Sequence, residues 1–173
     1  MRTRVTVTAL FAAALLTACG SISNNAGTVV SNASATAQDA GAALTAEQIA
    51  SQLAIHILRL DVTITYDKDS DPEGLLGQPH GYTSKVAFSD GRIPKSDTAI
   101  FSKGDVEVGG LIEVFADAAD LRARLQQLKD DGTKGGTALF EYDYVKGAIL
   151  VRVSHYLTPA QAAEYQTAVK QLS

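Results

Sequence analysis

The stretch ALFEYDYVKGAILVRVSHY, residues 138–156, carries the clearest fold signal in the sequence. Two runs rich in aromatic and β-branched residues flank the pair Lys146-Gly147, and such runs around a glycine-containing pair predict a β-hairpin. With Lys146-Gly147 as the turn, the expected cross-strand partners on one buried face are Tyr144 with Ile149, Tyr142 with Val151 and Phe140 with Val153.

The other face of this hairpin is charged. The same register places Glu141 opposite Arg152 as an exposed pair, which contributes roughly 0.2–1 kcal/mol. A slip of one residue would bury Glu141 and Asp143, so the pattern favours the alignment given above.

Helix signals lie on both sides of the hairpin. Thr45 with Gln48 and Thr158 with Gln161 fit capping boxes, and Pro159 follows the second cap at the first helical position. The first helix is expected to end near Leu60, with an apolar face made of Ile49, Leu53, His56, Ile57 and Leu60. On that face His56 is expected to be a core residue.

Strand and helix signals also occupy the middle of the chain. Alternation over residues 62–66 predicts a strand, and Gly109-Gly110 precedes another at 111–115. Asp117 is expected to cap a helix that stops at Asp130-Asp131-Gly132, with apolar positions at Leu121, Leu125 and Leu128. Together these elements predict a single small α+β domain with a largely antiparallel sheet and helices packed on one face.

The N-terminus has the pattern of an export signal. Arg2 and Arg4 precede an apolar run over residues 5–16, which is shorter than the roughly 20 residues that span a bilayer. Leu16-Thr17-Ala18-Cys19 then resembles the lipobox of bacterial lipoprotein signal peptides. The resemblance implies acylation of Cys19, cleavage before it, and anchoring on the extracytoplasmic face of the cell membrane. An ordinary secretory signal with an incidental cysteine is the alternative.

Composition divides the chain into three parts. Residues 1–18 form the expected signal peptide, 19–44 a flexible linker rich in Ser, Asn, Ala, Thr and Gly, and 45–173 the folded domain. The linker reaches roughly 25–30 Å. Cys19 is the only cysteine, which excludes an intrachain disulfide, and the net charge of −4 without a basic tract argues against nucleic acid as a partner.

An acidic, glycine-rich stretch over residues 66–90 is the first candidate for a site. Asp67, Asp69 and Asp71 match the first three ligand positions of an EF-hand-like calcium loop. The match then fails, because Pro72 replaces the glycine and Gln78 stands where the bidentate glutamate belongs. Calcium is therefore a weak expectation, beside a solvated acidic turn as the alternative.

The same stretch offers a possible contact surface for a peptide, a glycan or an unknown envelope protein. Leu75, Leu76, Tyr82 and Lys85 would form an apolar ridge with a neighbouring charge. The alternative is that the leucines and the tyrosine pin the loop to the core, which is the usual place of such side chains.

No pattern in the sequence predicts catalysis. Ser84 and Lys85 are adjacent in a predicted strand and point to opposite faces, so they form no dyad. The three histidines, His56, His80 and His155, lack metal-ligand spacing. With Cys19 acylated no thiol nucleophile remains. The sequence therefore favours a protein that is not an enzyme and that needs no cofactor.

Several short blocks resemble a family of small actinobacterial membrane lipoproteins of unknown function. They are Asp71-Pro72, Leu75-Leu76-Gly77, Pro79, Tyr82-Thr83-Ser84-Lys85, Gly109-Gly110, Glu113-Val114-Phe115, Glu141-Tyr142-Asp143-Tyr144 with Gly147, and Leu157-Thr158-Pro159 with Gln161-Ala162. Where the family has arginine, this chain has Gln78. The resemblance implies the cellular location and the domain limits but no activity.

Three functions are consistent with the sequence. The first is a non-enzymatic, lipid-anchored binding or interaction module of the cell envelope. The second is a superinfection-exclusion lipoprotein of a phage or prophage. This role is suggested because some lipoproteins of this kind are carried by phages or prophages. The third is a calcium-binding envelope domain.

Overall fold

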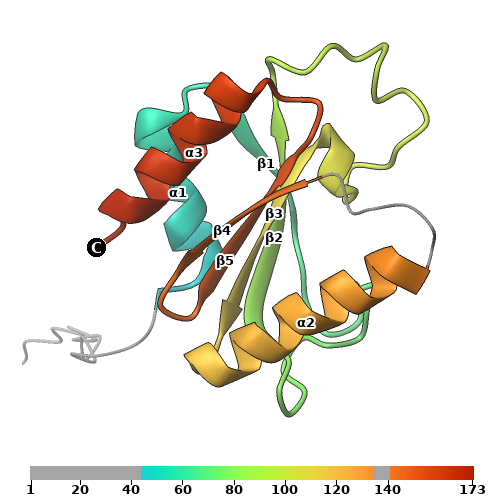
Figure 1. The fold of residues 1–173 in the computed structure, drawn as a ribbon, viewed down its shortest axis with the longest axis vertical. Helices are drawn as coiled ribbons and strands as arrows, with labels where there is room; N and C mark the ends of the chain where they lie inside the picture. Colours follow the sequence, from blue (N-terminus) through green and yellow to red (C-terminus); the bar gives the residue numbers. More distant parts are fainter. Residues whose placement is uncertain (1–43, 135–140) are drawn as a thin grey trace, which may run out of the picture. The chain divides into compact units, whose positions relative to one another are not determined.

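A five-stranded antiparallel sheet organises the part of the chain that the computed structural model describes, residues 44–134 and 141–173 (Figure 1). In chain order the elements are α1 (Ala46–His56), β1 (Leu60–Thr65), β2 (Tyr82–Asp90), η1 (Val106–Val108), β3 (Gly109–Phe115), α2 (Ala118–Lys134), β4 (Glu141–Lys146), β5 (Ile149–Ser154) and α3 (Pro159–Gln171). The strand order is β1-β2-β3-β5-β4, so β3 is central. The α+β class with an antiparallel sheet is confirmed.

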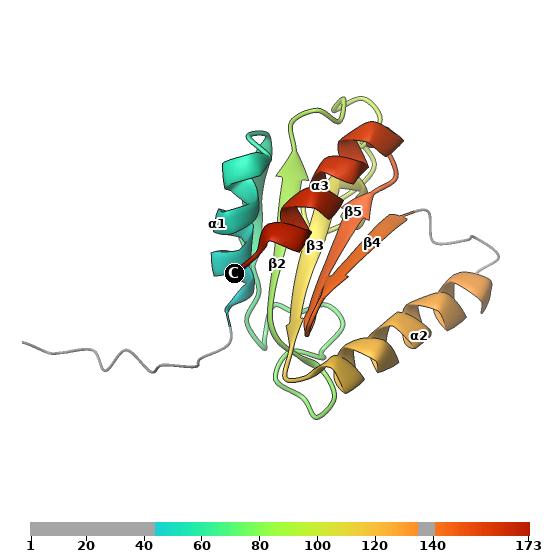
Figure 2. The same ribbon diagram turned by 60° about the vertical axis from the view of Figure 1, so that its left-hand side comes forward.

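Helices cover both faces of the sheet, so the expectation of one helical face is wrong. On one face α1 and α3 pack against Phe88, Ile112 and Val151. On the other, α2 packs through Leu121 and the neighbouring Leu128 (Figure 2). The sequence hides this arrangement because Glu113 gives β3 the pattern of a half-exposed strand, whereas the strand is buried at every position.

The described core residues all belong to the C-terminal part of the chain. Both apolar clusters are built from residues between Ala46 and Leu172. This part therefore contains its own hydrophobic core. The predicted signal peptide, the predicted lipidation site Cys19 and nearly all of the predicted linker lie outside the described residues.

Local capping signals predict the helix starts correctly. Thr45 with Gln48 and Thr158 with Gln161 each form a reciprocal capping box. The end of α1 differs from expectation, because the helix stops at His56 and leaves this side chain exposed. The prediction of His56 as a core residue is therefore wrong.

The start of α2 is also as expected, but its end is not. Asp117 Oδ1 accepts hydrogen bonds from the backbone N–H groups of Ala119 and Asp120. The helix then continues through Gly132 to Lys134, past the predicted stop. A glycine inside a helix costs only about 1 kcal/mol relative to alanine, which does not force an end.

The β4–β5 hairpin forms, with a register two residues away from the predicted one. Lys146 pairs with Ile149, Tyr144 with Val151 and Tyr142 with Val153, so the turn residues are Gly147 and Ala148. Gly147 has φ +60, as the first residue of a type II′ turn requires. Because the shift is even, the tyrosines keep their predicted face, while Phe140 lies outside the described residues.

We expect Gly110→Ala to destabilise the domain by about 1–3 kcal/mol, the usual cost of overpacking. A Cβ at Gly110 would overlap the carbonyl oxygen of Arg152 on β5 and the ring of Phe88. Gly147→Ala is the matched control, since nothing lies near its Cβ and only its positive φ opposes the change. Urea unfolding followed by circular dichroism measures both, and equal stability of Gly110→Ala and wild type would contradict this packing.

Candidate functional site

One carboxylate lies at the centre of the α2 side of the sheet. Glu113, on β3, is fully buried and accepts hydrogen bonds from two arginines. Arg124 of α2 donates from Nε to Oε2 at 3.1 Å and from Nη2 to Oε1 at 3.1 Å. Arg152 of β5 donates from Nη1 to Oε1 at 3.4 Å. A carboxylate is costly to bury alone, so these guanidinium groups supply the charge that makes its position tenable.

The loop between β1 and β2 is tied to the sheet by Asp71. Its Oδ2 accepts hydrogen bonds from the backbone N–H groups of Leu75 at 2.8 Å and Leu76 at 3.0 Å. Its Oδ1 accepts from the Tyr82 hydroxyl at 2.6 Å and from Lys85 Nζ at 3.1 Å. Both β2 side chains are buried. The loop is therefore held in one conformation from inside.

Glu73 joins this loop to α2. Lys85 Nζ donates to Glu73 Oε2 at 2.7 Å, and Arg124 Nη2 donates to Glu73 Oε1 at 2.6 Å. On the far side, Arg152 Nη2 donates to Glu141 Oε2 at 3.0 Å. We call the resulting set the ionic cluster; it consists of Asp71, Glu73, Tyr82, Lys85, Glu113, Arg124, Glu141 and Arg152.

The prediction of Glu141 and Arg152 as an exposed, directly opposite pair is wrong. Arg152 stands opposite Asp143, and Glu141 reaches it diagonally from a position opposite Ser154. The pair is buried rather than exposed, with Glu141 and Arg152 side chains only 2% and 8% accessible. It was predicted as a surface pair because this face was expected to meet solvent and not α2.

Charge balance sets the protonation of the carboxyl groups. Burial acts to raise the pKa of Asp71, but hydrogen bonds from Tyr82 and Lys85 outweigh it and lower the pKa to about 2. Glu73 follows the same balance, with Lys85 and Arg124 lowering its pKa to about 2. Both groups are ionised at neutral pH.

Asp143 behaves in the opposite way at the margin of the cluster. Partial burial of its carboxyl group and the nearby charge of Glu141 raise its pKa to about 6, although the residue as a whole stays exposed. The pKa of its carboxyl group therefore lies nearer neutral pH than those of Asp71 and Glu73.

The structure does not place the predicted contact residues on the surface. Tyr82 and Lys85 are fully enclosed, Leu76 is buried and Leu75 is half-buried against the α2-side core. They form no exposed ridge, in keeping with the alternative that such side chains pin the loop to the core. The signal for this was the charged Lys85 directly before the apolar run Val86-Ala87-Phe88, which favours a buried partner for the charge.

The aspartates proposed for calcium serve other roles. Asp67 Oδ1 accepts from the backbone N–H groups of Asp69 and Ser70 and closes a tight turn. Asp71 is committed to Lys85. Among the residues that the structure describes, no group of three potential ligands is arranged to hold a metal ion.

Ser84 and Lys85, the pair considered for catalysis, point to opposite faces of the sheet. Ser84 Oγ accepts from the backbone N–H of Ala46 on the α1 side, while Lys85 lies in the ionic cluster on the opposite face. His80 contacts Asp120 at 2.8 Å at the surface. Every buried polar side-chain atom in the described part of the chain has a hydrogen-bond partner. The buried side chains of the ionic cluster therefore find their hydrogen-bond partners within the protein.

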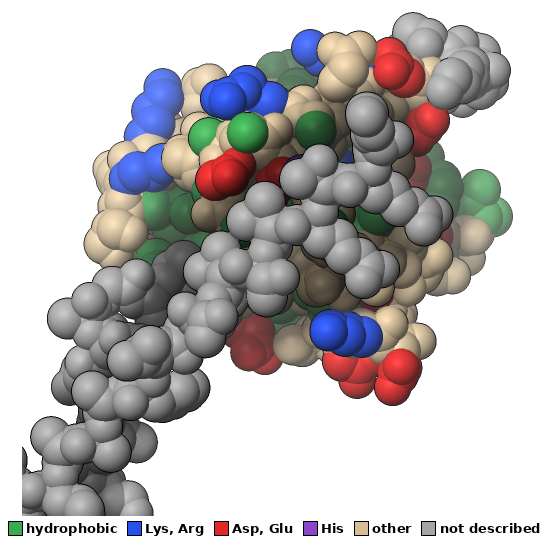
Figure 3. Space-filling view, turned by 90° about the horizontal axis from the view of Figure 1, so that it is seen from below, with side chains coloured by type: hydrophobic (Ala, Val, Ile, Leu, Met, Phe, Trp, Pro, Cys, Tyr) green, Lys and Arg blue, Asp and Glu red, His purple; other side chains and the backbone are tan. Residues whose placement is uncertain are grey.

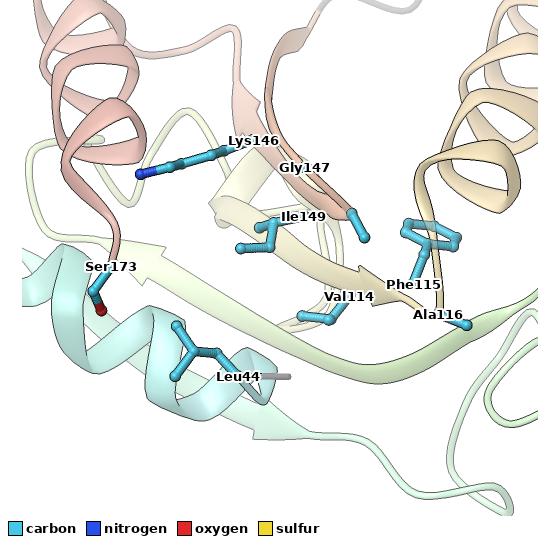
Figure 4. Close-up of a pocket in the computed structure, with 9 residues that line it drawn as sticks. Leu44, Val114, Phe115, Ala116, Lys146, Gly147, Ile149 and Ser173 are labelled. Atoms are coloured by element: carbon cyan, nitrogen blue, oxygen red, sulfur yellow. The ribbon is translucent and has the colours of Figure 1, made fainter. Parts of the chain in front are cut away.

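A hollow of about 300 Å³ opens at the end of the sheet beside the start of α1 (Figure 4). Leu44 forms one wall, Val114 and Ile149 come from β3 and β5, and Lys146 reaches across from β4. The remaining lining residues are Phe115, Ala116, Gly147, Ala148 and Ser173. The lining is mostly apolar, which is the usual character of a small-molecule site.

The molecular surface seen in Figure 3 carries charges of both signs. Lysine and arginine side chains stand in small groups, with aspartate and glutamate between and beyond them. The visible, described part of this face therefore presents no continuous basic area. As a candidate binding site, the hollow is therefore more distinctive than the charged surface.

We expect Lys85→Met to destabilise the domain by about 3–5 kcal/mol at pH 7, because the buried Asp71 loses its cationic partner and Glu73 keeps only Arg124. Asp71 and Glu73 have folded pKa values near 2, below about 4 in unfolded chains. The stability that these ionised carboxylates give the folded domain is fully present above about pH 4 and is lost as the pH falls toward 2. The free energies of unfolding of the variant and the wild type should therefore converge near pH 2.

Thermal and urea unfolding at pH 7, 4 and 2.5 measures this convergence. The matched control is the double variant Asp71→Asn with Lys85→Met, which removes both charges and should regain part of the lost stability. A deficit of the same size at pH 2.5 and pH 7 would rule out ion pairing as its cause.

Comparisons with known proteins leave the site to be judged on its own chemistry. No protein-family model, curated protein or solved structure matches this chain. Across residues 44–134 and 141–173, no helix has the length and apolarity needed to cross a membrane.

Proposed function

We propose that this chain is a lipid-anchored, non-enzymatic binding protein on the extracytoplasmic face of the bacterial cell envelope. Support for the anchor comes from the order of Arg2 and Arg4, the apolar run at 5–16 and the lipobox-like ending at Cys19. Two acyl chains at Cys19 would hold the protein stably at a membrane, where one would not.

The hollow beside Leu44 is the observation that carries the binding function. It is the place where Leu44, just before α1, and apolar side chains from β3 and the β4–β5 hairpin line an open space. Its size lies at the lower end of the range for ligand pockets. The loop over residues 67–85, proposed from the sequence as the contact surface, is less suited because its apolar side chains face inward.

Anchoring predicts that Cys19→Ala abolishes acylation of the full chain. Cells fed an alkyne-tagged fatty acid should label the wild type, which should fractionate with membranes, and should leave Cys19→Ala without label. Ser21→Ala is the matched control and should keep both properties. Label retained in Cys19→Ala, or absent from wild type, would refute the anchor.

Binding predicts that a neutral apolar probe enters the hollow. The chain from residue 19 onward, with Cys19→Ala, contains the complete described core and carries no competing acyl group. Titration with octanol should shift the methyl NMR signals of Ala148 and Ile149 in a saturable manner.

Two tryptophan variants localise that binding. Ala116→Trp, at an exposed position on the rim, should fill the hollow and abolish the shifts. Ala119→Trp is exposed on α2 away from the lining and should leave them unchanged. Absence of saturable shifts in a protein that circular dichroism shows to be folded would refute binding at this site.

A further inference from the structure

We propose that the hollow binds an anionic amphiphile with one hydrocarbon chain, in the manner of a free fatty acid, and that Lys146 holds its carboxylate. This proposal rests on the binding function proposed above and names its ligand class. It follows from the position of Lys146, the volume of the hollow and the charge of its lining.

Lys146 is fixed at the wall of the hollow by the end of α3. Its Nζ donates to the backbone carbonyl oxygen of Lys170 at 3.1 Å and to that of Leu172. An ammonium group has three N–H donors, so one remains for a further acceptor. The two carbonyl groups orient the charge without neutralising it, and Figure 4 shows the side chain lying along the wall between β4 and Ser173.

The apolar part of the hollow suits a single chain. Val114, Phe115, Ala148 and Ile149 supply apolar lining, and Leu44 stands across from Ile149 in Figure 4. A methylene group occupies about as much space as a water molecule, ~30 Å³, so the hollow accommodates roughly ten such groups. That is enough for one medium-length chain and too little for two.

The sign of the ligand's charge follows from the lining. Lys146 is the one charged side chain among the described residues that line the hollow. A carboxylate at the Lys146 end would gain a charge-assisted hydrogen bond, an alcohol would gain a weaker one, and an ammonium would be repelled. The order of affinity expected for eight-carbon probes is therefore octanoate, octanol and octylammonium.

The experiment uses the same chain from residue 19 with Cys19→Ala, and the same methyl signals, at pH 7. Octanoate should bind about threefold to fivefold more tightly than octanol, the difference that one partly exposed ion pair provides. Lys146→Gln should remove this preference, because it lowers the affinity for octanoate more than the affinity for octanol. Lys170→Gln is the matched control, because its side chain does not line the hollow and only its backbone contacts Lys146.

The possible failures separate the two proposals. If octanol binds and Ala116→Trp blocks it, but octanoate shows no preference or Lys146→Gln leaves that preference intact, the ligand class is wrong and the binding site stands. Equal or tighter binding of octylammonium would likewise overturn the ligand class. If none of the three probes binds to the folded protein, both proposals fall.

Discussion

The burial of Glu113 between Arg124 and Arg152 constrains the α2 side of this domain. A carboxylate in the middle of the central strand is tolerable only where α2 brings a guanidinium group above it. Arg124 also binds Glu73, so the position of the helix and that of the β1–β2 loop depend on the same side chain. The loop gains its order from electrostatic partners that the sheet and α2 provide.

Local signals predicted local structure well. The capping boxes at Thr45 and Thr158 depend on residues three positions apart, and both occur in the structure. The hairpin was found for the same reason, since its strands and turn are adjacent in sequence. Its register was missed because either Lys146-Gly147 or Gly147-Ala148 is an acceptable turn, since a glycine with positive φ fits either position, and only the observed pairing of Lys146 with Ile149 makes Gly147 the first turn residue.

The ionic cluster could not be derived in the same way. Its members lie far apart in sequence, and Glu113 reads as the outward-facing residue of a half-exposed strand until α2 is known to cover that face. The same error made Glu141 and Arg152 look like a surface pair. The hollow was equally hidden, because Leu44, Val114 and Lys146 meet only once the sheet order is known. For such features the sequence supplies the residue types and the fold supplies their proximity.

The two faces of the sheet differ in the balance of forces that hold them. The α1 and α3 side is held mainly by apolar packing, including the stacked rings of Phe88 and Tyr165, and contains one buried carboxylate, Asp90, paired with Arg92. The α2 side depends on carboxylates that must stay ionised. Native proteins open in cooperative units of unequal stability. Because more of the ion pairs lie on the α2 side, we expect acid to open α2 and the β1–β2 loop before the opposite layer, so that one domain contains two units of unequal resistance to acid.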